Sequence, residues 1–135
     1  MPITTGLPAG PFTGVVPTLP NQTNPSIATA GSGFVIVFAF DPGRAQVWGL
    51  RITASGALIG QPFKINTKDQ ISIGGQKVVG LKDGGFVVVW TGGPGTANSG
   101  EIYGQRYDVK GAKVGGEFIV NTTQSGTQSF PVVAA

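Results

Sequence analysis

Few side chains in this sequence are suited to catalysis. It contains no histidine and no cysteine, which excludes the common nucleophile–base pairs, disulfides and thiolate metal sites. A carboxylate pair can hydrolyse a glycosidic bond, and Asp83, Glu101 and Asp108 are the loose candidates. However, Asp83 lies in an Asp-Gly-Gly turn and Asp108 follows a strand, where turn formation alone favours Asp. We therefore expect no enzyme activity and no catalytic residues.

The acidic residues also argue against a metal site. Calcium takes about six to eight oxygen ligands with several carboxylates among them. The six acids of this chain never cluster in the sequence. We therefore expect no metal ligands and no cofactor, and calcium binding is left as the disfavoured alternative.

Two arginines are the most informative polar residues. Arg51 and Arg106 fall at equivalent positions of two similar strands. An arginine inside a sheet usually tethers a neighbouring loop through carbonyls or a carboxylate. The alternative is a contact with a ligand or with another subunit.

Large aromatic side chains supply a second kind of binding chemistry. Lectins stack aromatic faces on sugar rings, with amide and guanidinium donors nearby. A lectin-like site in each repeat would use Trp48, Arg51, Tyr103, Gln105 and Arg106. Since Trp48 and Tyr103 occupy matching positions, core packing is the favoured interpretation of the aromatic residues.

These candidates lie within an internal repeat of roughly fifty-three residues. Four blocks recur in the same order: Phe34–Phe38 with Phe86–Trp90, Val47–Ile52 with Ile102–Tyr107, Gly56–Gly60 with Gly111–Gly115, and Phe63–Thr67 with Phe118–Thr122. The division that follows is an N-terminal segment with a partial repeat (1–24), repeat unit 1 (25–76), repeat unit 2 (77–129) and the first strand of a further unit (130–135).

Each unit reads as four short strands separated by turns rich in glycine. The second strand, Phe34–Phe40 or Phe86–Trp90, is continuously apolar, which is typical of a strand buried on both faces. In the third, Gln46–Thr53, alternation puts Trp48, Leu50 and Ile52 on one face. Four antiparallel strands in about fifty residues match a propeller blade. We predict an all-β fold of about two propeller-like blades, or alternatively a β-sandwich.

Composition indicates where such a chain works. Only 11% of its residues are charged, against about 25% in a typical soluble domain. Such a surface suits a protein outside the cell or on a particle that packs against copies of itself. The net charge of +3 is scattered, so we expect no nucleic-acid partner. No apolar run approaches a membrane span, and Met1–Gly10 does not read as a signal peptide.

The sequence also resembles a known kind of repeat. The strings GGFVVVW, IYGQRYD and GAKVGGEFIVNT are similar to repeats of large bacterial secreted proteins, the adhesin-like and RTX-type (hemolysin-type calcium-binding) proteins. The resemblance implies a propeller-like array, an extracellular adhesive or structural role, and no catalytic residues. The loop Thr91–Gly100 departs from that family because it lacks the usual carboxylates, which puts calcium binding in doubt.

Two isolated blades would leave hydrophobic edges open to pairing. We therefore predict a non-enzymatic extracellular, cell-surface or virion protein that self-assembles by strand pairing into a filament, ring or layer. The end fragments would supply the contacts, through Pro11, Phe12, Pro131, Val132 and Val133. The alternative is a lectin-like module that binds surface glycans.

Overall fold

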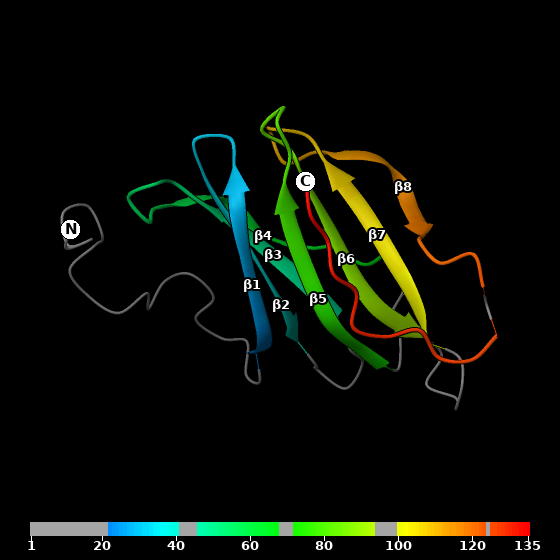
Figure 1. The fold of residues 1–135 in the computed structure, drawn as a ribbon. Helices are drawn as coiled ribbons and strands as arrows, with labels where there is room; N and C mark the ends of the chain where they lie inside the picture. Colours follow the sequence, from blue (N-terminus) through cyan, green and yellow to red (C-terminus); the bar gives the residue numbers. More distant parts are fainter. Residues whose placement is uncertain (1–21, 41–45, 68–71, 94–99, 124) are drawn as a thin grey trace.

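The computed structural model describes residues 22–40, 46–67, 72–93, 100–123 and 125–135. These residues form eight β-strands and no helix (Figure 1). Sheet 1 contains β1 (Gln22–Ala30), β2 (Gly33–Phe40), β3 (Gln46–Ile52) and β4 (Leu58–Lys64). Sheet 2 contains β5 (Ser72–Gly80), β6 (Phe86–Gly93), β7 (Glu101–Tyr107) and β8 (Lys113–Ile119). The predicted all-β antiparallel architecture is therefore confirmed.

Both sheets are simple meanders in which each strand pairs with the next along the chain. Tight turns make this possible. In the β3–β4 and β7–β8 turns, the amides of Gly56 and Gly111 donate to the carbonyls of Thr53 and Asp108, 3.0 Å away in each case. Both glycines have a positive φ, 89° and 83°, a conformation that other residues rarely adopt.

The two sheets share one register. Phe34 pairs with Ile52 in sheet 1 as Phe86 pairs with Tyr107 in sheet 2. A bulge interrupts β3 between Gly49 and Arg51, and its counterpart lies in β7. The repeated sequence blocks thus occupy repeated structural positions, and we call residues at matching positions equivalent.

Strand alternation separates two apolar clusters, as predicted for β2 and β3. Val35, Val37 and Val47 point toward sheet 2, where they join a core that contains Phe86, Val88, Trp90 and Tyr107. Phe38, Phe40, Leu50 and Ile52 form a second cluster, with Trp48 against it. We call the face of each sheet that points to the other sheet its inner face, and the opposite face its outer face.

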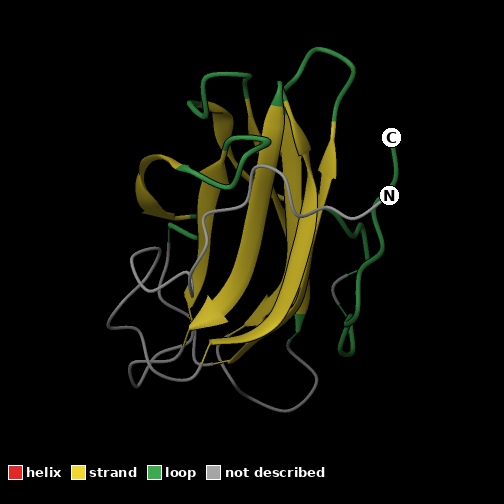
Figure 2. Cartoon of the chain, turned by 90° about the vertical axis from the view of Figure 1, so that its left-hand side faces the viewer, coloured by secondary structure: helices red, strands yellow, loops and turns green. Residues whose placement is uncertain are grey.

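The sheets meet through their first strands. β5 packs against β1 and also contacts β2. Figures 1 and 2 show two open antiparallel sheets, with the connecting turns at the ends of the strands. An arrangement like that of a sandwich fits these described strands, which form neither a ring nor a barrel.

The C-terminal segment differs from its prediction. Pro131–Ala135 was expected to form an opening strand, but residues 127–135 form no strand. A β-ladder needs a hydrogen-bonded neighbour, and none of the described strands pairs with this segment. The segment instead runs along sheet 2, in red in Figure 1. The Phe130 amide donates to Thr91 Oγ1 at 3.2 Å, and the Gln128 amide donates to the Gly100 carbonyl at 2.9 Å.

Candidate functional site

The layer between the two sheets contains the aromatic and polar contacts that join one sheet to the other. Phe63 of β4 projects into it and contacts two aromatic rings of sheet 2. Its ring centroid lies 5.5 Å from Tyr107 and 6.4 Å from Phe86, and these two rings stack at 4.7 Å. Gly49 lies beneath the Phe63 ring, since a Cβ built there would approach the ring to 2.7 Å. The absence of a side chain at Gly49 therefore lets the ring lie flat on β3.

Arg51 links the two repeat units directly. Its Nη1 donates to the Lys110 carbonyl and its Nη2 to the Val109 carbonyl, both at 2.6 Å. Both acceptors belong to the β7–β8 turn of the other unit. Arg51 thus tethers a neighbouring loop, which is the structural role that the sequence suggested for it.

Further polar contacts join sheet 1 to sheet 2. Gln76 Nε2 donates to the Thr23 carbonyl at 3.0 Å and also bonds the Asn24 carbonyl. The Gly31 amide donates to the Gly84 carbonyl at 2.8 Å, which joins the first turns of the two units. Lys113 Nζ donates to the Ile65 carbonyl at 3.1 Å. The units are therefore held by backbone acceptors and side-chain donors as well as by apolar packing.

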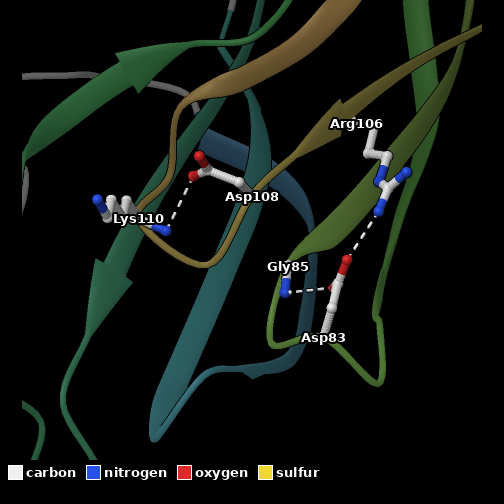
Figure 3. Close-up of polar contacts among 5 residues, drawn as sticks. All are labelled: Asp83, Gly85, Arg106, Asp108 and Lys110. Atoms are coloured by element: carbon white, nitrogen blue, oxygen red, sulfur yellow. Dashed lines mark hydrogen bonds and ion pairs between the residues drawn. The ribbon is translucent and has the colours of Figure 1, made fainter.

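Arg106, the equivalent of Arg51, has a different partner. Its Nη2 lies 2.7 Å from Asp83 Oδ2, within the same unit (Figure 3). The Gly85 amide donates to the other Asp83 oxygen at 2.9 Å. The Gly85 hydrogen bond, followed by the one from Arg106, holds the Asp83 pKa below its usual value. The two side chains are about half exposed, and a shallow depression of about 510 Å³ lies beside them.

Asp108 has a local role, as expected of an aspartate in a turn. Its Oδ1 accepts hydrogen bonds from the amides of Lys110 and Ala112, both at 2.9 Å (Figure 3). Asp83 likewise caps its own turn. The described residues contain no group of three or more acids that could hold a metal ion.

Within each repeat, the residues of the predicted lectin-like sites lie on both faces of the sheet, with Trp48 opposite in orientation to Arg51 and Tyr103 opposite to Arg106. Trp48 lies against the outer cluster of sheet 1, and its Nε1 donates to Gln46 Oε1 at 2.8 Å. Tyr103 stacks on Trp90 at 6.1 Å on the inner face of sheet 2. Gln105 is fully buried, and its Nε2 donates to the Gly115 carbonyl at 3.2 Å. A glycan site built from these residues therefore stays a prediction.

Both tyrosines of the chain lie in or beside the layer between the sheets. Burial, and then the negative charge of Glu117, raise the pKa of Tyr107 far above its usual value. Burial also raises the pKa of Tyr103, with smaller effects from Glu101 and Glu117. Both phenols therefore stay neutral in the folded protein at moderately alkaline pH.

The predicted assembly residues lie in two places. Pro11 and Phe12 fall outside the described residues. Pro131 lies next to Gly75 of β5, while Val132 is 89% exposed. Their proposed contact with other copies stays a prediction.

Sequence reasoning missed the surface that the second unit leaves open. Val114, Phe118 and Val120 lie on the outer face of sheet 2 and are all exposed. Their equivalents in sheet 1 face the inter-sheet layer. The match between Phe63-Lys64-Ile65 and Phe118-Ile119-Val120 carried this signal, but the register was needed to assign each residue to a face.

The described residues contain no helix long and apolar enough to cross a membrane. No protein-family model, curated protein or solved structure matches the chain.

Proposed function

We propose that this chain is a non-enzymatic structural module whose propeller-like units assemble with units of other copies. One observation carries the proposal: the stacking of one unit on another is repeated along the chain. β5 lies against the first two strands of unit 1, and the C-terminal segment contacts the first two strands of sheet 2, with Phe130 and Pro131 next to Gly75 of β5 and the Phe130 amide bonded to Thr91 of β6.

A shared backbone feature supports this equivalence. Asn24 and Gly75 are the first residues of the bulges in β1 and β5, and both have positive φ, 51° and 61°. Phe130, which precedes a proline as Asn24 does, has a φ of 57°. A phenylalanine rarely adopts this conformation, so its surroundings must hold it there. Residues 130–135 thus follow the path of a first strand, on which a further unit could be built.

Blade-like stacking also accounts for the kinds of contact between the units. The Arg51 guanidinium and the Gln76 amide bind backbone carbonyls, which every repeat offers whatever its side chains are. Contacts of this type are transferable from one unit to the next. A chain that makes them internally has the chemistry to make them with another copy.

Exposed sheet edges offer the predicted mode of assembly. β4 and β8 each pair with one strand only among the described strands. An edge strand presents unpaired amides and carbonyls that another chain can bind. Strand pairing at these edges would extend the sheets into a filament, ring or layer. The low charge of the chain, 11%, favours close packing of copies outside the cell or on a particle.

Light scattering coupled to size exclusion tests the proposal with the intact chain. We expect the mass to rise above the 13.8 kDa of one chain as concentration increases from about 1 to about 100 µM, where an interface of micromolar Kd fills. Electron micrographs at the upper concentration would then show ordered particles. A mass of one chain over the whole range would refute the proposal.

A further inference from the structure

The outer face of sheet 2 is the counterpart of a surface that sheet 1 keeps buried. Val120 is 49% exposed, whereas its equivalent Ile65 is fully buried between the sheets. Phe118 is 46% exposed, whereas Phe63 packs on two rings of the other unit. The positions along β4 that unit 2 covers in unit 1 are therefore exposed along β8 in unit 2, while Val89 and Ile102 in the middle of the same face are already buried. We call Val114, Phe118, Val120 and Arg106 the open face.

On the open face, the Phe118 ring already has the position that Phe63 takes in unit 1. A Cβ built on Gly104 would approach the Phe118 ring to 2.6 Å, just as one on Gly49 would approach Phe63 to 2.7 Å. The Phe118 ring thus lies over Gly104 of its own sheet, as the Phe63 ring lies over Gly49 in the covered unit. A partner would find the ring in place, so little conformational entropy is lost when it docks.

Two arrangements could cover the open face with a second copy. A head-to-tail stack, like the one inside the chain, would use the outer cluster of sheet 1, because that cluster is equivalent to the inner face of sheet 2. Its members are already buried, however, with Phe38 and Leu50 each only 4% exposed. The other arrangement brings the open faces of two copies together, and this face is free on both.

We propose that two copies pack their open faces together around a two-fold axis. This inference rests on the proposed self-association and adds a contact between sheet faces, which leaves the edges of β4 and β8 available for strand pairing. Two-fold contacts are the commonest way in which identical chains associate, because one patch then serves both partners. Face-to-face packing of two sheets, with apolar side chains between them, is also the arrangement that sandwiches use.

Charge on the open face fits the same symmetry. Arg106 and Asp83 lie side by side at its rim, next to Lys82 and Val87 in the shallow depression. A surface that carries both signs can be complementary to itself across a two-fold axis. Arg51 provides the precedent, since a guanidinium at this register already reaches the carbonyls of an adjacent unit. In the dimer, Arg106 can bind the partner while Asp83 remains capped by the Gly85 amide.

A matched pair of substitutions tests the surface. Val120 and Ile119 are neighbours at the end of β8 with similar exposure, 49% and 44%, but they point to opposite faces. Val120→Lys places a charge in the proposed contact, while Ile119→Lys places the same charge on the other side. We expect Val120→Lys to raise the dissociation constant at least about a hundredfold, because a dimer loses two buried valines. Ile119→Lys should change it less than about threefold, since its side chain lies outside the contact.

Cross-linking tests the symmetry independently of any effect on folding. The chain has no cysteine, so Val120→Cys introduces a single thiol. A short bis-maleimide should join two Val120→Cys chains into a covalent dimer and should leave Ile119→Cys chains mostly unlinked. A head-to-tail contact would instead place Val120 against a different surface of the neighbouring copy, so that Val120→Cys chains would stay mostly unlinked.

The outcomes separate this inference from the proposed function. If the intact chain stays monomeric, both fail. If it associates but Val120→Lys and Ile119→Lys weaken it equally, or neither does, the proposed surface is wrong and the proposed function stands. If Val120→Lys alone weakens association but Val120→Cys does not cross-link, the two-fold symmetry is wrong.

Discussion

Comparing Phe63→Ala with Phe118→Ala would measure how much one unit gains from the next. The two phenylalanines occupy equivalent positions, and each covers a glycine of its own sheet. Only Phe63 has a neighbouring unit against it, where it contacts Phe86 and Tyr107. The difference between the two losses of stability therefore isolates the contact between units.

The expected magnitudes follow from burial. Replacing a well-buried phenylalanine by alanine costs about 3–5 kcal/mol, and aromatic contacts contribute about 0.5–1.5 kcal/mol beyond buried area. Phe63 is not fully buried, so we expect Phe63→Ala to lower the free energy of unfolding by about 3 kcal/mol. Phe118 is 46% exposed, so Phe118→Ala should cost about half as much, roughly 1.5 kcal/mol.

Urea unfolding monitored by tryptophan fluorescence would give both values. The protein should be dilute enough to remain monomeric, because self-association would add stability at Phe118 alone. The comparison requires equal m values, which indicate that both variants unfold from the same degree of compactness. Equal losses for the two substitutions would refute the reasoning, since they would show that the neighbouring unit adds nothing at Phe63.

Three further predictions concern the layer between the sheets. Asn66→Ala removes the buried oxygen that accepts the Val47 amide at 2.8 Å, so unfolding should become easier by about 1–3 kcal/mol in urea. Arg51→Met removes two hydrogen bonds to the other unit and should lower the free energy of unfolding by about 1–2 kcal/mol in the same assay. Arg106→Met should change the free energy of unfolding little, because the ion pair that it removes is exposed. Both tyrosines have a raised pKa in the folded state, so the neutral phenols stabilise the fold below pH 10 and stability falls as pH rises beyond it. Absorbance at 295 nm should therefore show that the tyrosines of the folded chain ionise at higher pH than those of the unfolded chain, with Tyr107 ionising last; ionisation of both tyrosines at the same pH in the folded and unfolded chains would contradict the burial of these rings.

Much of the fold could be predicted because its signals are local. Continuously apolar runs such as Phe86–Trp90 and turns such as Asp83-Gly84-Gly85 define strands and hairpins through backbone and burial preferences alone. The alternation in Gln46–Ile52 also assigned Trp48 and Leu50 to one face, as the structure has them. These features depend on neighbours that are close in the sequence.

The inter-unit contacts could not be predicted in the same way. Arg51 and Arg106 have the same sequence environment, yet one bonds the carbonyls of another unit and the other bonds Asp83. The difference arises because unit 1 has a covering neighbour, and because Asp83 has no carboxylate counterpart in the first turn of unit 1, where Gly31-Ser32 stands. Tertiary context of this kind is not encoded in periodicity.

The C-terminal segment illustrates the same limit. Its likeness to the Asn24-Pro25 region led to the prediction of a strand over residues 130–135, whereas the structure has no strand there. Strand formation requires a paired neighbour, and propensity cannot replace one. The exposure of Phe118 and Val120 could not be predicted either, because it depends on whether another sheet covers their own.

Sedimentation velocity of the intact chain over a concentration series tests the central claim most directly. The claim is that this protein functions by association of its own units. We predict a sedimentation coefficient that rises with concentration from that of one chain to that of two or more, with Val120→Lys showing the same rise only at higher concentrations. A single, concentration-independent coefficient for one chain would contradict the account.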